Sequence, residues 1–215
     1  MTPSRRKVEE PPAAGILPTS GGMAAWRLGV LLFSVSCGPS APAKAPDVRA
    51  ANLSPPAGAT LVQACTPTGP ELCFNAIDDN CNGVIDEGCG EQTGPLQFTI
   101  AWNAAAADVN LVVVTPSQER VPSEHARTSA DGFHLDRDCP GEEGCGGQNV
   151  ENVFYDGPDP PRGHYLVEIS LGELHGAAPP IAVRFGARLG ARTVGFDTQL
   201  APGDDARKTF SFDVE

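Results

Sequence analysis

Apolar and polar side chains alternate with a period of two through residues 91–215. Leu96, Phe98, Ile100 and Trp102 form one such run, and Phe210, Phe212 and Val214 close the chain in the same way. Successive side chains of a β-strand point to opposite faces, so this period is typical of half-buried strands. The chain also holds 24 Gly and 21 Pro, residues that break helices. The pattern predicts an all-β fold and excludes a helical bundle or a coiled coil.

Eight strands are expected in residues 91–215, separated by Gly, Pro, Asp and Asn. Leu111–Val114 is continuously apolar, as expected for a central strand. Half-buried strands without a helical segment predict an antiparallel β-sandwich. The expected strands lie near residues 96–103, 108–115, 131–136, 149–155, 163–172, 180–189, 192–199 and 207–214.

Residues 1–37 have the layout of a secretory signal, in which either Met23 is the true start or residues 1–22 extend the charged region before the apolar stretch. The apolar stretch Leu28–Cys37 follows Arg27 and is too short to span a bilayer. Its end resembles a bacterial lipobox, with Ser34 where lipoboxes prefer an aliphatic residue, and the resemblance implies lipidation of Cys37. The alternative is an ordinary cleaved signal that leaves Cys37 free. Lipidation would leave six of the seven cysteines to pair.

Residues 38–60 are rich in Pro and Ala and lack bulky apolar residues, so they are expected to form a disordered linker. The whole chain carries 15 Lys and Arg against 27 Asp and Glu, a formal charge of −12. Such an acidic chain is a poor partner for nucleic acid or an anionic membrane surface. The charge favours a cation as partner.

Residues 61–90 combine regular cysteine spacing with an acidic, asparagine-rich loop. Cysteines recur every eight residues, which predicts disulfides in three alternative pairings among Cys65, Cys73, Cys81 and Cys89. The loop fits a calcium-binding pattern with Gly83 at the sharp turn. An EF-hand supplies a bidentate Glu where Cys89 stands, so this loop is not an EF-hand, and weak binding, with Kd about 10⁻⁴–10⁻³ M, is expected. The expected ligands are Asp78, Asn80, Asn82, the carbonyl of Val84, Asp86 and the neighbouring Glu87.

The stretch Cys73–Cys89 resembles the MopE-like metal-binding motif of secreted myxobacterial proteins and the thrombospondin type 3 calcium loop. The MopE-like resemblance implies copper. The segment has no His, however, and both Met residues precede Cys37, so soft copper ligands are missing. Calcium is therefore the expected ion. A four-cysteine zinc site and a disulfide knot with solvated acids are the alternatives.

A second set of oxygen side chains lies in the expected sandwich. Residues i and i+2 of a strand share a face, which pairs Asp108 with Asn110 and Asp136 with Asp138. With Glu151, these residues predict a second calcium site; the alternative is a charged, solvated sheet edge. Cys139 and Cys145 are expected to form a local disulfide.

The order of several short motifs in this region resembles the YfaP-like domain of bacterial secreted proteins, a domain of unknown function. The matching motifs are Asp108–Leu111, Leu135–Asp138, Asn149–Val153 and Pro161–Tyr165. The resemblance implies a secreted β-domain and assigns no activity.

The sequence contains no hydrolase, metalloprotease, phosphate-loop or dinucleotide motif, and its four His are isolated. We therefore expect no catalysis. The expected protein is a calcium-stabilised binding or adhesion module of the cell envelope. It would sit on the outer membrane or surface of a Gram-negative bacterium, touching the membrane only through its lipid; otherwise it would be periplasmic or secreted. Its partner would be an envelope or extracellular protein or polysaccharide. The alternatives are a hydrolase or hydrolase-accessory domain that binds carbohydrate or peptide, and a purely structural envelope protein.

Overall fold

The computed structural model describes residues 48–62, 69–123, 126–141 and 145–215. These residues form eleven β-strands and include no helix long and apolar enough to cross a membrane. The strands are β1 (Ala50–Ser54), β2 (Thr60–Val62), β3 (Leu96–Trp102), β4 (Val109–Val114), β5 (Arg120–Val121), β6 (Phe133–Asp138), β7 (Val150–Tyr155), β8 (Gly163–Leu171), β9 (Ile181–Leu189), β10 (Arg192–Leu200) and β11 (Arg207–Val214).

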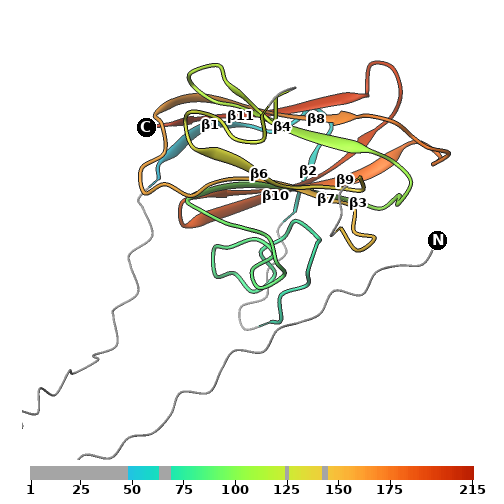
Figure 1. The fold of residues 1–215 in the computed structure, drawn as a ribbon, viewed down its shortest axis with the longest axis horizontal. Coiled ribbons are helices and arrows are strands. Elements are labelled where there is room, and N and C mark those ends of the chain that lie inside the picture. The colour runs from blue at the N-terminus through green and yellow to red at the C-terminus, as the bar shows by residue number, and fades with distance from the viewer. Residues whose placement is uncertain (1–47, 63–68, 124–125, 142–144) are drawn as a thin grey trace, which may run out of the picture. The chain divides into compact units, whose positions relative to one another are not determined.

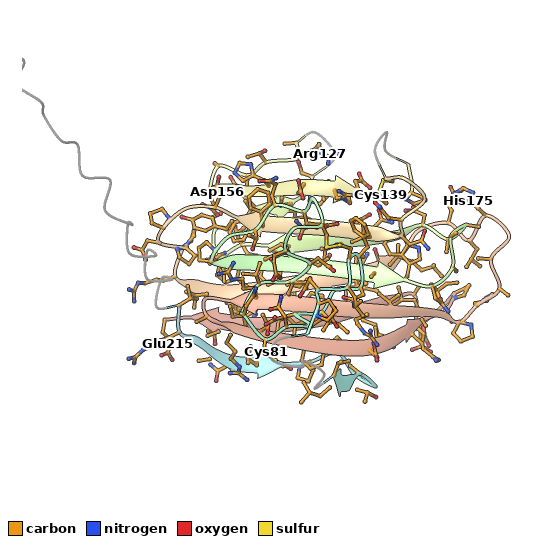
Figure 2. The ribbon with its side chains drawn as sticks, turned by 90° about the horizontal axis from the view of Figure 1, so that it is seen from below. Cys81, Arg127, Cys139, Asp156, His175 and Glu215 are labelled. Carbon is orange, nitrogen blue, oxygen red and sulfur yellow. A yellow bond between two sulfur atoms is a disulfide. The ribbon has the colours of Figure 1, made fainter. Side chains whose placement is uncertain are left out.

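Two antiparallel sheets pack face to face, as Figure 1 shows, and confirm the predicted β-sandwich. The first sheet has the order β1-β11-β8-β4-β5, and the second has the order β2-β10-β9-β3-β7-β6. Consecutive strands often lie in different sheets, so the sheets are joined through the chain as well as through the core. In Figure 2, Cys139 and His175 lie at one end of the sandwich, and Asp156 and Glu215 lie at the other.

The core lies between the sheets and is formed by the predicted alternating residues. Phe98 and Phe185 of the second sheet meet Phe210 and Phe212 of the first, with the Phe185 and Phe210 ring centroids 5.2 Å apart. All four side chains are fully buried. Truncating a buried Phe to Ala typically costs about 3–5 kcal/mol, so this cluster is a major source of stability.

The eight predicted strands are all present, with ends that differ by at most two residues. Three further strands, β1, β2 and β5, were missed. The linker prediction was wrong for part of residues 38–60, because β1 pairs with β11 and β2 pairs with β10. Ala, Asn and Ser in β1 give a weak strand signal, and pairing to a long neighbouring strand supplies what local propensity lacks. The linker residues before 48 lie outside the described ranges.

β3 is buried along its whole length, although its sequence alternates. Phe98 and Ile100 face the core, whereas Gln97 and Thr99 face the other side of the sheet. The cysteine-rich segment, here residues 69–91, covers that outer face, since Gln97 Nε2 donates to the carbonyl of Ile85 at 3.2 Å. The sheet therefore has a core on one face and this segment on the other.

Candidate metal centre in the cysteine-rich segment

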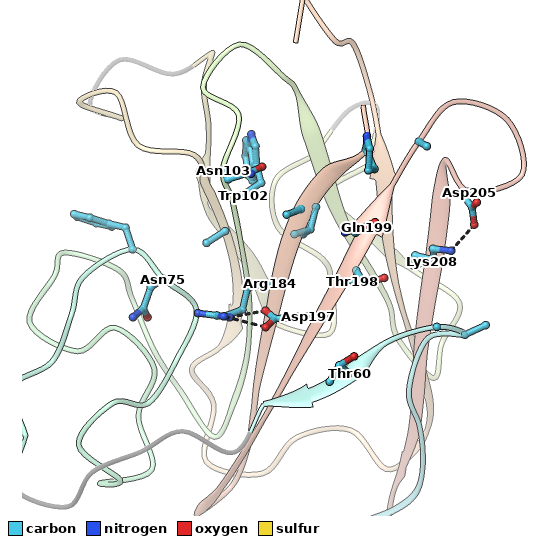
Figure 3. A pocket seen from close by; sticks show the side chains of 18 residues that line it. Thr60, Asn75, Trp102, Asn103, Arg184, Asp197, Thr198, Gln199, Asp205 and Lys208 are labelled. Atoms are coloured by element: carbon cyan, nitrogen blue, oxygen red, sulfur yellow. Dashed lines mark hydrogen bonds and ion pairs between the residues drawn. The ribbon is translucent and has the colours of Figure 1, made fainter. Parts of the chain in front are cut away.

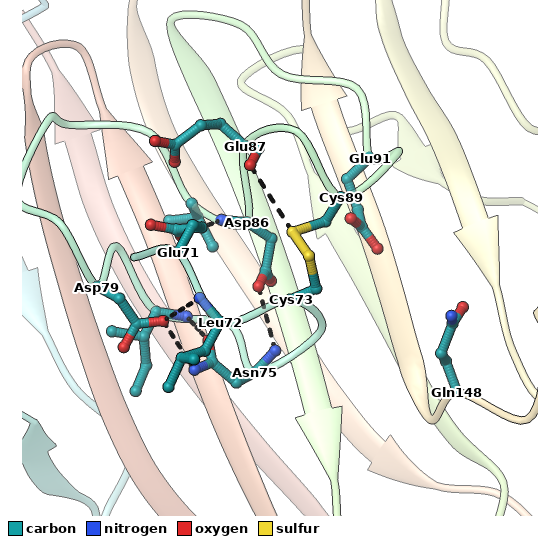
Figure 4. The surroundings of a disulfide bond; sticks show 12 residues. Glu71, Leu72, Cys73, Asn75, Asp79, Asp86, Glu87, Cys89, Glu91 and Gln148 are labelled. Atoms are coloured by element: carbon teal, nitrogen blue, oxygen red, sulfur yellow. Dashed lines mark hydrogen bonds between the residues drawn. A yellow bond between two sulfur atoms is a disulfide. The ribbon is translucent and has the colours of Figure 1, made fainter. Parts of the chain in front are cut away.

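Two of the predicted disulfides can be followed in the described residues. Cys73 pairs with Cys89, closing a loop around the acidic stretch 78–87, and Cys139 pairs with Cys145 as predicted. Cys81 is also disulfide-bonded. Cys65 and the predicted lipidation site Cys37 lie outside the described residues. The 73–89 bridge brings Glu71, Asp86 and Glu87 around one side of the segment (Figure 4).

Asp78, the first predicted ligand, uses its carboxylate to shape the loop. Its Oδ1 accepts from the backbone N–H of Asn82 at 3.0 Å, and its Oδ2 accepts from that of Gly83 at 2.9 Å. Thr193 of β10 donates its hydroxyl to the same Oδ2 at 3.0 Å. Gly83 has φ +88°, and a Cβ there would lie 3.3 Å from the carbonyl oxygen of Ala191, so glycine serves both the turn and the close approach to the sheet.

Asp86 holds the preceding turn in the same way. Its Oδ1 accepts from the N–H of Asn75 at 3.2 Å, and its Oδ2 accepts from the N–H of Ala76 at 3.0 Å. Burial raises the pKa of Asp86 to about 6, although these N–H groups favour the charged form. Asp78 and Asp86, the two residues that the sequence predicts as charged ligands, therefore both hold the loop backbone through their carboxylates.

Glu71 and Glu87 are different, because each has one buried oxygen without a hydrogen-bond donor. Glu71 Oε1 accepts from the N–H of Asp86 at 3.0 Å, and Glu87 Oε1 accepts from the side-chain amides of Asn80 and Asn82. The second oxygen of each carboxylate is buried and accepts nothing. Burial, and next the charge of Glu87, raises the pKa of Glu71 to about 7. Two such carboxylates repel each other unless a proton or a cation neutralises them.

Sequence reasoning missed Glu71, because it precedes the loop pattern and Cys73. Its only signal is that it is an acid two residues before a cysteine of the motif. Val84 donates its N–H to Asn82 Oδ1 at 2.8 Å, and the predicted role of its carbonyl stays a prediction. Asn80 Oδ1 and Asn82 Oδ1 accept from the N–H groups of Asn82 and Val84 at 3.0 and 2.8 Å, turning their amide nitrogens to Glu87.

A buried ion pair fastens the segment to the edge strand β6. The side chain of Glu91 is 0% exposed, and its Oε1 lies 3.4 Å from Nε of Arg137. The Arg137 guanidinium lies over the ring of Phe74, 5.2 Å from the centroid, and also donates to Gln148. Burial raises the pKa of Glu91 to about 7, although Arg137 opposes the rise. The segment is thus attached at both β10, through Asp78, and β6.

The second predicted site is only partly assembled. Glu151 is 2% exposed, and its Oε2 accepts from the N–H of Leu111 at 2.6 Å. Its carboxyl group is also hydrogen-bonded to Asp138. Burial first, and then the charges of Asp138 and Asp108, raise its pKa well above the usual range. Asn110 donates to Asp108 at 3.3 Å, which confirms that this pair shares a face.

The predicted pairing of Asp136 with Asp138 on one face was wrong. The register of β6 against β7 shifts between Leu135 and Arg137, and this bulge inserts one residue. Asp136 therefore faces the cysteine-rich segment, where its Oδ2 accepts from the N–H of Gln92 at 2.8 Å and from Asn152 at 3.1 Å. Asp138 lies on the opposite side, with Glu151.

No three Asp, Glu, His or Cys side chains in the described ranges are close enough together to hold a metal ion as they stand. A cation at either cluster would require the ligands to move inward. The two orphaned oxygens of Glu71 and Glu87 fit a hard divalent ion, because they are anionic, buried and without donors. The chain matches no family model, no curated protein and no solved structure.

Proposed function

We propose that this protein is a calcium-stabilised, non-catalytic binding module of a bacterial cell envelope. The observation that carries the proposal is the pair of buried, donor-free oxygens on Glu71 and Glu87. Calcium takes six to eight hard oxygen ligands, and this segment offers carboxylates, amide oxygens and carbonyls without any His. The ion would supply the positive charge that the buried carboxylates lack.

In this proposal the acidic residues divide into two groups. Asp78 and Asp86 hold the loop backbone, whereas Glu71 and Glu87 bind the ion together with Asn80 and Asn82. Turning the two amides would present their oxygens beside Glu87, and the N–H of Asn82 would keep Asp78 as its acceptor at 3.0 Å. Calcium bound there would strengthen the attachment of the segment to the sheet, since Asp86 and Asp78 belong to the same loop.

The carboxylates Asp108, Asp138 and Glu151, with Asn110, support a second and weaker calcium site at the end of the sandwich. Asp136 is excluded from it by its position. The module would be lipid-anchored through Cys37 at the outer membrane or cell surface of a Gram-negative bacterium, and would present the sandwich to an envelope or extracellular partner. The lipobox resemblance around Cys37 supports this location.

The test is a thermal melt of the metal-free protein with added calcium or magnesium. Calcium should raise the Tm, and Glu71→Gln and Glu87→Gln should each remove most of that rise. Glu173→Gln, on a side chain 76% exposed, is the matched control and should keep the full rise. An equal rise in all four proteins, or none in the wild type, would refute the proposal.

A further inference from the structure

A groove with a volume of about 750 Å³ lies on the outer face of the six-stranded sheet (Figure 3). Its floor is made of outward-facing residues of β3, β9 and β10. Phe74 and Asn75 of the cysteine-rich segment line one part, and Thr60 of β2 lines another. The floor is low where Ala101 and Ala182 carry only methyl groups. The volume is within the range of about 300–1,000 Å³ that is typical of ligand sites.

The charges in this groove cancel. Arg184 donates twice to Asp197, with Nε to Oδ1 at 2.6 Å and Nη2 to Oδ2 at 3.0 Å. Lys208, which lines the groove from β11 of the five-stranded sheet, donates to Asp205 at 2.7 Å. Two cations and two carboxylates leave no net charge, in a chain whose formal charge is −12. An ionic ligand would meet as much repulsion as attraction here, so charge complementarity selects a neutral ligand.

The remaining polar groups suit a ligand that is rich in hydroxyls. The side chains of Asn103, Gln199 and Thr60 line the groove and make no hydrogen bond within the described part of the chain. The Arg184–Asp197 pair keeps further donor and acceptor positions open on adjacent strands. Amides and paired charged groups each offer two hydrogen bonds in one plane, which matches neighbouring hydroxyls of a sugar ring. Phe74 and the two alanines supply the apolar contact.

We propose that this groove binds a neutral oligosaccharide. The inference rests on the binding role given under the proposed function and names the chemistry of its ligand. A neutral extended peptide is the competing occupant, but a peptide would gain affinity chiefly by pairing along a strand edge. β2 pairs with β10 over Gly195–Asp197 and leaves only Thr198–Leu200 of that edge open beside the groove, among the described residues. Three residues are too few for a peptide to gain much affinity by strand pairing, so the observations favour the sugar.

The test is calorimetric titration of the calcium-loaded full chain with cellopentaose, maltopentaose, laminaripentaose and chitopentaose. At least one should bind saturably, with an affinity that is the same at low and high salt, because no net charge is involved. Ala182→Trp should fill the floor and abolish binding. Gln199→Ala and Asn103→Ala should each weaken binding up to about tenfold, the worth of one hydrogen bond.

Thr209→Trp, at an exposed position of β11 in the other sheet, is the matched control and should bind like the wild type. Failure of all four sugars to bind, or binding that survives Ala182→Trp, overturns the proposal. Preferential, salt-sensitive binding of heparin or of an acidic peptide overturns it as well. If the calcium-dependent rise in Tm persists without sugar binding, the groove proposal fails alone; if both are missing, the proposed function fails with it.

Discussion

Glu91 shows how one buried carboxylate makes the stability of this fold depend on pH. Its pKa rises from 4.5 to about 7 on folding, because burial outweighs the attraction of Arg137. The folded protein therefore binds more protons than the unfolded chain between these values, and the free energy of unfolding falls as the pH rises from about 4.5 to about 7. Glu91→Gln mimics the protonated form, so this variant should lose less stability over that range.

The measurement is urea unfolding in calcium-free buffer at several pH values. Glu173→Gln, which changes an exposed carboxylate, should follow the wild-type pH dependence. If the free energy of unfolding of Glu91→Gln depended on pH in the same way as that of the wild type, the inference that the Glu91 carboxyl group titrates in this range would be wrong.

The strands whose alternation is set by the core could be predicted from the sequence. Phe98, Val183 and Phe210 sit at period-two positions, and the structure places all of them between the sheets. β1 could not be predicted, because its strand character comes from pairing with β11, a partner more than a hundred residues away in sequence. Such pairing is a tertiary effect that overrides local propensity.

For the candidate metal centre, the sequence predicted which types of residue gather in the cysteine-rich segment, but not how their side chains are arranged. The loop pattern predicted Asp78 and Asp86 as ligands of the ion, whereas the structure shows both carboxylates accepting backbone N–H groups of their own loop, because sequence spacing cannot show which atoms a carboxylate meets. The prediction that Asp136 and Asp138 share a face was wrong for a different reason. One inserted residue at a bulge moves the following side chains of the strand to the opposite face of the sheet.

Gly186 in β9 permits the cysteine-rich segment to lie directly on the sheet. A Cβ at this position would lie 2.3 Å from the carbonyl oxygen of Ala76, which is backbone and cannot turn away. Gly186→Ala should therefore push the segment off the sheet, lower the free energy of unfolding by about 1–3 kcal/mol and reduce the calcium-dependent rise in Tm.

Gly195 of β10 provides the matched control, because it is the cross-strand partner of Gly186. A Cβ at Gly195 would find its nearest neighbour, the Val62 side chain, at 3.6 Å, an ordinary contact. Gly195→Ala should unfold like the wild type or slightly later, since alanine suits a strand better than glycine. Equal stability of the two variants in urea would contradict direct packing of the segment on β9.

At the scale of the whole molecule, the cysteine-rich segment and the sandwich behave as one folded body. The described residues between 48 and 215 form a single compact unit, and contacts at Gln97, Thr193 and Arg137 join the segment to three different strands. The segment has too few residues to form a hydrophobic core of its own, so it is stabilised by packing on the outer face of the sheet. Anything that neutralises its carboxylates should therefore stabilise the sandwich as well.

Protons and calcium should compete for this stabilising role. The pKa of Glu71 is raised to about 7 and that of Asp86 to about 6, so both groups are protonated in the folded protein below these values and charged above them. Without calcium, the free energy of unfolding should fall as the pH rises from about 4 to about 7, because burial, and then the neighbouring carboxylates, disfavour the charged forms. Calcium should offset the part of that fall that comes from Glu71, because the ion binds the charged form of this carboxylate. The calcium-dependent rise in Tm should thus be large above pH 7 and nearly vanish close to pH 4.5, measured by adding calcium to metal-free protein; a rise of the same size at both ends would show that calcium acts somewhere other than these carboxylates.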